Sequence, residues 1–177
     1  MYTLLRNAFS HSNYRLIECE ELHSLLSSGN KTNLKVLHAY RPENRANNMA
    51  ETVNFITQGH IPGAYFVSIN YLQDLSSKFG DTVPSDEQFI QFMKWSDFSK
   101  EDGIVIYSDS PTISSRVHWL FDVFGHTNLY FLNGGFKRWQ NLNLQVEKGL
   151  GKFSSTISSR PDSHFDYKMD RTKYIDF

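Results

Sequence analysis

The sequence has 177 residues and a formal net charge of −1 at pH 7. This small charge gives no field that would attract nucleic acid or an anionic membrane. No apolar run approaches the roughly 20 residues that span a bilayer. The length fits one domain that buries about 70% of its unfolded surface, so we expect one globular domain with neither a nucleic-acid nor a membrane partner.

The chain has a single cysteine, Cys19, so no internal disulfide can form, which agrees with a reducing compartment. Residues 1–17 contain Arg6 and Arg15 and no acidic residue, a composition that weakly resembles a mitochondrial presequence. Two arginines are few for such a signal, and we favour a short lead-in to the first helix. We expect an intracellular protein, cytoplasmic or mitochondrial.

Apolar spacing predicts helices that alternate with strands along the chain. In chain order, the predicted elements are a helix over Glu18–Leu26, a strand over Leu34–Leu37, a short helix over Ala50–Ile56, a strand over Tyr65–Ile69, a helix over Asp86–Trp95, a strand over Ile104–Tyr107, a helix over Ser114–Gly125, a strand over Leu129–Leu132 and a helix over Phe136–Asn141. Ser85 and Gln88 form a capping box before the third helix.

The long polar stretch from His38 to Gly59 is predicted to run over the surface. The alternation of the remaining elements predicts an α/β fold, an open, mainly parallel twisted sheet with helices on both faces. From Gly149 onward the chain is polar, with many serines. We therefore expect a domain over 1–148, with 1–14 as its lead-in, followed by a polar tail or linker over 149–177.

The segment from Ile104 to Gly125 is predicted to carry the function. A loop between the carboxyl end of a strand and the amino end of a helix collects free backbone N–H groups, which makes an anion site. The candidate residues of this loop and the start of its helix are Ser108, Asp109, Ser110, Pro111, Thr112, Ile113, Ser114 and Arg116. Arg116 could equally hold an anion or form a salt bridge.

Other candidates have simpler explanations. His118, Asp122 and His126 have the spacing of metal ligands on one helical face, but Gly125 is expected to end the helix before His126. We predict no metal site and no other cofactor. His60 lies in a turn and fits a hydrogen-bonded structural histidine better than a general base.

Two further groups of residues are predicted to be structural. The turn Asn133-Gly134-Gly135 is more typical of a backbone requirement than of a binding site. The aromatic residues around it are expected in the core; they are Trp119, Phe121, Phe124, Phe136 and Trp139.

Three segments resemble those of one family. They are Gly59-His-Ile-Pro-Gly-Ala64, Ser115-Arg-Val-His-Trp-Leu-Phe-Asp-Val-Phe-Gly-His126 and Leu132-Asn-Gly-Gly-Phe-Lys-Arg-Trp139. The family is the rhodanese-like sulfurtransferases. The sequence is most similar to the amino-terminal domain of the two-domain thiosulfate and 3-mercaptopyruvate sulfurtransferases, over roughly residues 15–148.

The resemblance implies a loop that an active domain opens with a cysteine, which carries sulfur as a persulfide to an acceptor. It also implies that two-domain members keep this cysteine in the second domain and that the amino-terminal domain is inactive. Here Ser108 occupies the cysteine position. A second departure is Leu37-His38-Ala39, where the family often has Leu-Asp-Ala.

An oxygen cannot form a persulfide, and a hydroxyl is a weak nucleophile without an adjacent base. Asp109 adds negative charge where a sulfur anion would bind. Cys19 lies on the apolar face of a predicted helix, as a buried, inert thiol would. These features predict a pseudoenzyme with no catalytic residue, which binds a protein partner as a scaffold or regulator and retains weak affinity for small anions.

Two alternatives remain open. One is thiosulfate or 3-mercaptopyruvate sulfurtransferase activity with a cysteine supplied from another chain. The other is a phosphatase-like anion-binding domain, which would need a loop cysteine closed by an arginine.

Overall fold

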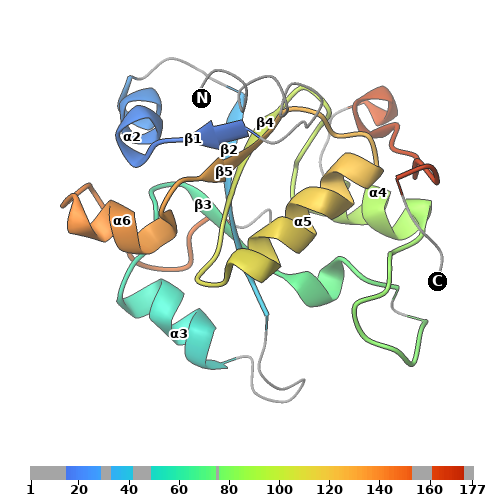
Figure 1. The fold of residues 1–177 in the computed structure, drawn as a ribbon, viewed down its shortest axis with the longest axis horizontal. Coiled ribbons are helices and arrows are strands. Elements are labelled where there is room, and N and C mark those ends of the chain that lie inside the picture. The colour runs from blue at the N-terminus through green and yellow to red at the C-terminus, as the bar shows by residue number, and fades with distance from the viewer. Residues whose placement is uncertain (1–14, 29–32, 42–48, 75, 153–160, 174–177) are drawn as a thin grey trace, which may run out of the picture.

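A computed structural model describes residues 15–28, 33–41, 49–74, 76–152 and 161–173 (Figure 1). The elements follow one another as β1 (Arg15–Ile17), α2 (Cys19–Ser27), β2 (Leu34–Tyr40), α3 (Met49–Thr57), β3 (Ala64–Ser68), η1 (Ile69–Tyr71), α4 (Asp86–Trp95), β4 (Gly103–Tyr107), α5 (Pro111–Val123), β5 (Leu129–Leu132), α6 (Gly135–Asn141) and η2 (Asp162–Phe165). The strands form one sheet in the order β1-β5-β4-β2-β3, and every pair is parallel. The predicted α/β sheet is confirmed.

Helices cover both faces of this sheet: α2, α3 and α6 lie on one face, and α4 and α5 on the other (Figure 1). The central strand β4 is buried along its whole length. Its side chains alternate as the pleat requires, with Ile104 and Ile106 in the core under α4 and α5, and Val105 and Tyr107 in the core under α2 and α6. The carboxyl ends of all five parallel strands meet at one edge, where β4 leads into α5.

Several predicted elements agree closely with the structure. The helix over Asp86–Trp95 and the strand over Leu129–Leu132 have the predicted bounds. Both bonds of the capping box are present: the Ser85 hydroxyl accepts from the N–H of Gln88, and the Gln88 side chain accepts from the N–H of Ser85.

The prediction of a surface excursion beginning at His38 is wrong for the first three residues. Strand β2 continues to Tyr40 because it lies between two other strands, with His38 opposite Phe66 on one side and Tyr107 on the other. Residues 42–48 of the excursion lie outside the described part of the chain. The sequence analysis also missed strand β1, a three-residue edge strand whose last residue, Ile17, is its one buried position.

The predicted start of α5 at Ser114 is wrong by three residues. The helix begins at Pro111, preceded by Ser110 as the N-cap. Proline suits the first helical position because its φ is already helical and no intrahelical N–H is needed there. The helix ends at Val123, and Gly125 follows with φ 81°, the left-handed conformation common just beyond a helix end.

The polar segment after Gly149 packs on the domain over residues 161–173. Phe165 and Tyr167 are each 2% exposed and belong to the core under α4 and α5. The N–H of Asp170 donates to the carbonyl of Val123 at 2.7 Å, and Lys94 pairs with Asp162 at 2.6 Å. Over these residues the segment is therefore a packed extension. No helix in the described ranges combines the length and the hydropathy needed to cross a bilayer.

Candidate functional site

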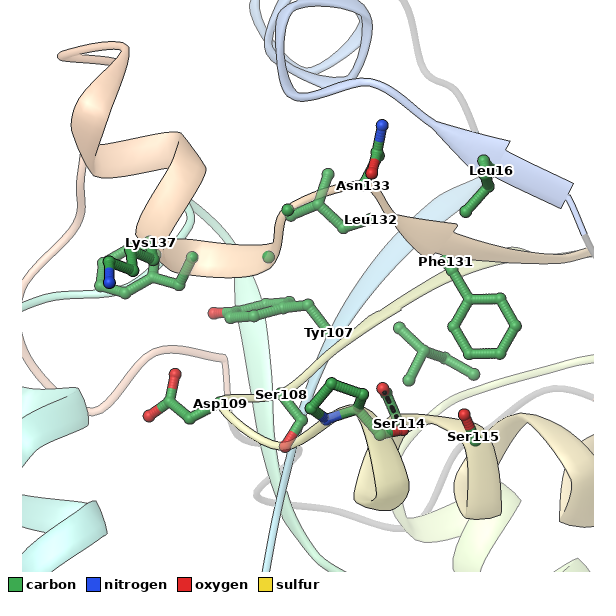
Figure 2. Close-up of a pocket in the computed structure, with 15 residues that line it drawn as sticks. Leu16, Tyr107, Ser108, Asp109, Ser114, Ser115, Phe131, Leu132, Asn133 and Lys137 are labelled. Carbon is green, nitrogen blue, oxygen red and sulfur yellow. Dashed lines mark hydrogen bonds between the residues drawn. The ribbon is translucent and has the colours of Figure 1, made fainter.

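A pocket of about 640 Å³ opens at the carboxyl ends of β4 and β5, between the start of α5 and the start of α6 (Figure 2). Its lining comes from four places: Leu16 of β1; Ile106 and Tyr107 of β4 with Ser108, Asp109, Pro111, Ser114 and Ser115 after it; Phe131 and Leu132 of β5; and the turn residues Asn133 and Gly134 with the first residues of α6, Gly135, Phe136 and Lys137. Parallel strands bring these segments together because their carboxyl ends share one edge of the sheet.

The turn from β4 into α5 contains three residues, Ser108, Asp109 and Ser110. The Oγ of Ser108 accepts a hydrogen bond from the N–H of Ser110 at 3.2 Å. The N–H groups of Ile113 and Ser114 both donate to the carbonyl of Ser110, at 3.1 Å and 3.2 Å. Pro111 has no N–H, so this turn offers fewer free donors to an anion than the expected open loop.

The predicted loop residues separate into two groups. Ser108, Asp109, Pro111 and Ser114 line the pocket, whereas Ser110, Thr112, Ile113 and Arg116 are not among its lining. The guanidinium of Arg116 faces the other side of the helix, where it donates to the carbonyl of Thr82 at 3.0 Å and lies 3.6 Å from the carboxylate of Asp81. Of its two predicted roles, the structure places Arg116 in the salt bridge.

The turn from β5 into α6 forms the opposite wall. Gly134 and Gly135 have φ angles of 79° and 58°, in the left-handed region that favours glycine. A Cβ on Gly134 would lie 2.6 Å from the side chain of Arg138, and one on Gly135 would lie 3.5 Å from the carbonyl oxygen of Ser108. The expected backbone requirement is therefore present, and the same turn also lines the pocket, which the sequence analysis did not predict.

Tyr107 forms the buried floor of the pocket and is 1% exposed. Its hydroxyl accepts from the N–H of Ile61 at 3.5 Å, and burial raises the pKa of this phenol. The ring of His38 lies beneath it, with ring centres 4.6 Å apart. Burial, with the nearby His60 as a second cause, lowers the pKa of His38 to about 3, so this imidazole is neutral at pH 7.

His60 is fully buried and does not line the pocket. Its Nδ1 lies 3.1 Å from the carbonyl of Phe55, and its ring stacks on that of Phe55 at 3.8 Å. A carbonyl only accepts, so Nδ1 is the protonated nitrogen. This geometry favours the structural role predicted for His60 over that of a general base.

Cys19 lies behind the wall of the pocket and does not line it. The thiol is fully buried, and its Sγ lies 3.4 Å from the carbonyl oxygen of Asn133. Burial raises the pKa of the thiol, which disfavours the reactive thiolate. The predicted buried position of Cys19 is confirmed.

The residues with metal-ligand spacing are used elsewhere. His126 lies beyond the end of α5, where its Nε2 donates to the carbonyl of Asp102 at 3.0 Å, and Asp122 pairs with Lys173 at 2.9 Å. His118 stacks on Phe131 with ring centres 4.4 Å apart. In the ranges that the structure describes, no three His, Cys, Asp or Glu residues are grouped to hold a metal ion.

Eleven lining residues were not site candidates in the sequence analysis: Leu16, Ile106, Tyr107, Ser115, Phe131, Leu132, Asn133, Gly134, Gly135, Phe136 and Lys137. Their place in the pocket follows from the strand order β1-β5-β4, which brings three separate segments to one edge. Six of these residues, from Leu132 to Lys137, lie in the third segment that resembles the rhodanese-like family, and this segment was the signal available in the sequence.

The model of the rhodanese-like domain matches residues 20–142 of this sequence. The chain belongs to the rhodanese-like family. The matched residues include every strand of the sheet except β1, which precedes residue 20. They also include every residue that lines the pocket except Leu16.

Relatives of known name are sulfurtransferases. The rhodanese-like domain is 30% identical to thiosulfate/3-mercaptopyruvate sulfurtransferase 2 of Arabidopsis thaliana over 142 residues, which cover 78% of this chain and 40% of the relative. It is 31% identical to thiosulfate sulfurtransferase of Gallus gallus over 144 residues, 78% of this chain and 46% of the relative. A third relative, the mitochondrial sulfurtransferase 1 of Arabidopsis thaliana, is 31% identical over 117 residues, 64% of this chain and 30% of the relative.

Solved structures share the fold. The Tum1 protein of Saccharomyces cerevisiae superposes with a TM-score of 0.66 at 23% identity, covering 89% of this chain and 50% of that chain. The 3-mercaptopyruvate sulfurtransferase of Leishmania major gives 0.67 at 18% identity, covering 91% and 42%. The chain spans 30–46% of the length of the three named sulfurtransferase relatives.

Proposed function

We propose that this rhodanese-like domain transfers no sulfur by itself and acts as a binding or scaffold module, with the pocket beside Ser108 as its contact site. The observation that carries the proposal is the hydroxyl of Ser108 at the first position after β4. Sulfur transfer needs a thiolate there, and an oxygen nucleophile forms no persulfide.

The surroundings of Ser108 do not activate its hydroxyl. A serine nucleophile needs a base within hydrogen-bond reach. No histidine lines the pocket among the described residues, and the Oγ of Ser108 already accepts from the N–H of Ser110. These contacts support a structural role for the hydroxyl, which closes the turn.

The turn is also poorly suited to hold the sulfur anion of a persulfide. Its N–H groups at Ser110, Ile113 and Ser114 are bonded within the turn and the helix, and Arg116 is paired with Asp81 outside the pocket. The carboxylate of Asp109 lines the pocket and repels an anion. The phosphatase-like alternative meets the same obstacles.

Turnover assays test the proposal directly. The purified chain is incubated with thiosulfate and cyanide, and separately with 3-mercaptopyruvate and a thiol acceptor. We expect no turnover above background for the natural chain and for Ser108→Ala. Turnover by the natural chain that Ser108→Ala abolishes would overturn the proposal.

A second pair of variants tests whether the turn retains an anion cradle. Ser108→Cys puts a thiol at the reactive position, and Ser115→Cys puts one elsewhere in the same pocket as a matched control. We expect similar, low reactivity of both thiols toward iodoacetamide and thiosulfate. A thiol at 108 that reacts more than about tenfold faster would show a functional cradle, since a helix terminus with free donors lowers a thiol pKa.

The second candidate is a share in a sulfurtransferase whose cysteine belongs to another domain or chain. One observation favours it: the sulfurtransferase relatives extend well beyond the matched 30–46% of their length. The tagged protein is captured from its source cell, and the bound material is assayed with both sulfur donors. Turnover that iodoacetamide abolishes and Ser108→Ala leaves intact would support this candidate; its absence from the captured complex would remove it.

The compartment belongs to the same proposal. One relative is named as mitochondrial, and the single cysteine fits a reducing environment. We propose a mitochondrial or cytoplasmic location, which imaging of the full-length, carboxyl-terminally tagged protein would test. Secretion of the tagged protein would contradict it.

A further inference from the structure

The pocket beside Ser108 has an apolar end and a charged end. Figure 2 shows Leu16 and Phe131 toward one end, and Asp109 and Lys137 toward the other. Leu16 is 69% exposed, so a ligand in the pocket could still cover much of its side chain. The volume of about 640 Å³ falls within the roughly 300–1,000 Å³ typical of small-molecule sites.

The two charged residues of this pocket are not engaged with the rest of the domain. Within the described part of the chain, neither Asp109 nor Lys137 forms an ion pair or a side-chain hydrogen bond. The neighbouring Arg138 contrasts with them, because it pairs with Glu18 at 3.0 Å. The pocket thus presents one free cation and one free anion beside an apolar wall.

We propose that this pocket binds a small zwitterion with an apolar side chain, of the class of the apolar α-amino acids. The ligand carboxylate faces Lys137, its ammonium group faces Asp109, and its side chain lies against Leu16 and Phe131. This inference rests on the proposed role of the domain as a binding module, since it names the ligand of that module.

The charge pattern selects this class over its neighbours. A simple anion meets the carboxylate of Asp109 and a turn in which the N–H groups of Ser110, Ile113 and Ser114 are already bonded. A simple cation meets Lys137. A peptide terminus carries only one of the two charges next to its terminal side chain, whereas a free amino acid carries both and matches both residues.

The test is a titration of the ¹⁵N-labelled chain with L-phenylalanine, followed by the backbone amide signals of Ser115, Gly134 and Gly135. Three further probes each remove one feature: N-acetyl-L-phenylalanine lacks the cation, L-phenylalaninamide lacks the anion, and glycine lacks the apolar group. We expect saturable shifts at these amides with L-phenylalanine. We expect the two blocked probes to bind about three- to fivefold more weakly, as for exposed charge pairs, and glycine to give no saturable shift.

Variants assign each contact. Lys137→Met should weaken the binding of L-phenylalanine to the level of L-phenylalaninamide and leave the binding of L-phenylalaninamide unchanged. Asp109→Asn should weaken the binding of L-phenylalanine to the level of N-acetyl-L-phenylalanine and leave the binding of N-acetyl-L-phenylalanine unchanged. Leu16→Ser should weaken L-phenylalanine by at least about fivefold through lost apolar contact. Lys148→Met, at an exposed lysine outside the pocket, is the matched control and should change nothing.

Three results would overturn the inference: no saturable shift at the pocket amides of the folded chain, equal binding of the free and blocked probes, or an equal loss in Lys137→Met and Lys148→Met. Each of these leaves the absence of sulfur transfer untouched, because that absence is measured by turnover. Conversely, turnover in the natural chain would remove the proposed function without altering the binding result.

Discussion

Helix α5 connects two regions of opposite character. At its first turn, the pocket is lined by partly or fully exposed polar side chains such as Ser108 and Asp109. Beyond its last turn, His126 and Tyr167 are buried and bonded to each other at 3.1 Å. The difference indicates that the half-buried Ser108 and the exposed Asp109 of the pocket can vary at little cost in stability, whereas the contact with the carboxyl-terminal extension is part of the core.

The largest expected effect lies at the extension. Phe165→Ala should lower the free energy of unfolding by about 3–5 kcal/mol, since it removes a phenyl ring that is 2% exposed and leaves a cavity. Urea denaturation measures the loss. Phe79→Ala, at a ring that is 66% exposed, is the control and should cost little. A loss below about 1 kcal/mol for Phe165→Ala would mean that the extension is not part of the core, which would contradict the difference between the two regions.

The next effect concerns acid sensitivity beneath the pocket. The pKa of His38 is about 3 in the folded chain and 6.5 in the unfolded chain, so between these values the unfolded state binds the extra proton. The contribution of His38 to the free energy of unfolding is therefore fully present above pH 6.5 and is lost as the pH is lowered toward 3. His38 alone should remove about 2 kcal/mol between pH 8 and pH 5.

Denaturation curves at several pH values, compared with those of His38→Asn, isolate this contribution. The variant should lose less stability than the natural chain over the same range, whatever its stability at pH 8. Equal slopes for the two proteins would mean that His38 titrates normally and that the floor of the pocket is open to water.

A smaller effect is expected from the hydroxyl of Tyr167. The Nε2 of His126 donates to the carbonyl of Asp102, so its Nδ1 must accept, and Tyr167 donates to it. Tyr167→Phe leaves this buried nitrogen without its donor and should cost about 1–2 kcal/mol. Thermal denaturation at pH 8 measures it, and a neutral result would show that water replaces the hydroxyl.

The smallest effect is expected at Ser108. Its Oγ accepts from the N–H of Ser110 at a half-exposed turn, where water can take its place. Ser108→Ala should therefore change the free energy of unfolding by no more than about 0.5 kcal/mol. Measured beside Tyr167→Phe, this variant sharpens the contrast between the two regions. A loss above about 1.5 kcal/mol would show that water does not replace the Ser108 hydroxyl in the turn.

Much of the fold could be predicted because its signals are local. The buried strand Ile104–Tyr107, the capping box at Ser85 and the helical spacing of Val117, Leu120 and Phe121 depend on neighbours within a few residues. Strand β1 and the end of β2 could not be predicted from such signals. Both extend because a partner strand, distant in sequence, satisfies their backbone groups.

The candidate site divides in the same way. The sequence by itself determined that residue 108 is a serine, that Asp109 follows it, and that the only cysteine, Cys19, is distant from residue 108 in the sequence. These identities decide which chemistry is possible. Only the tertiary structure decided that Arg116 turns away to Asp81 and that Leu16, Phe131 and Lys137 join the pocket. The physical reason is that the reactivity of a residue depends on its own side chain, whereas its neighbours in the fold depend on strand order and helix packing across the whole sheet.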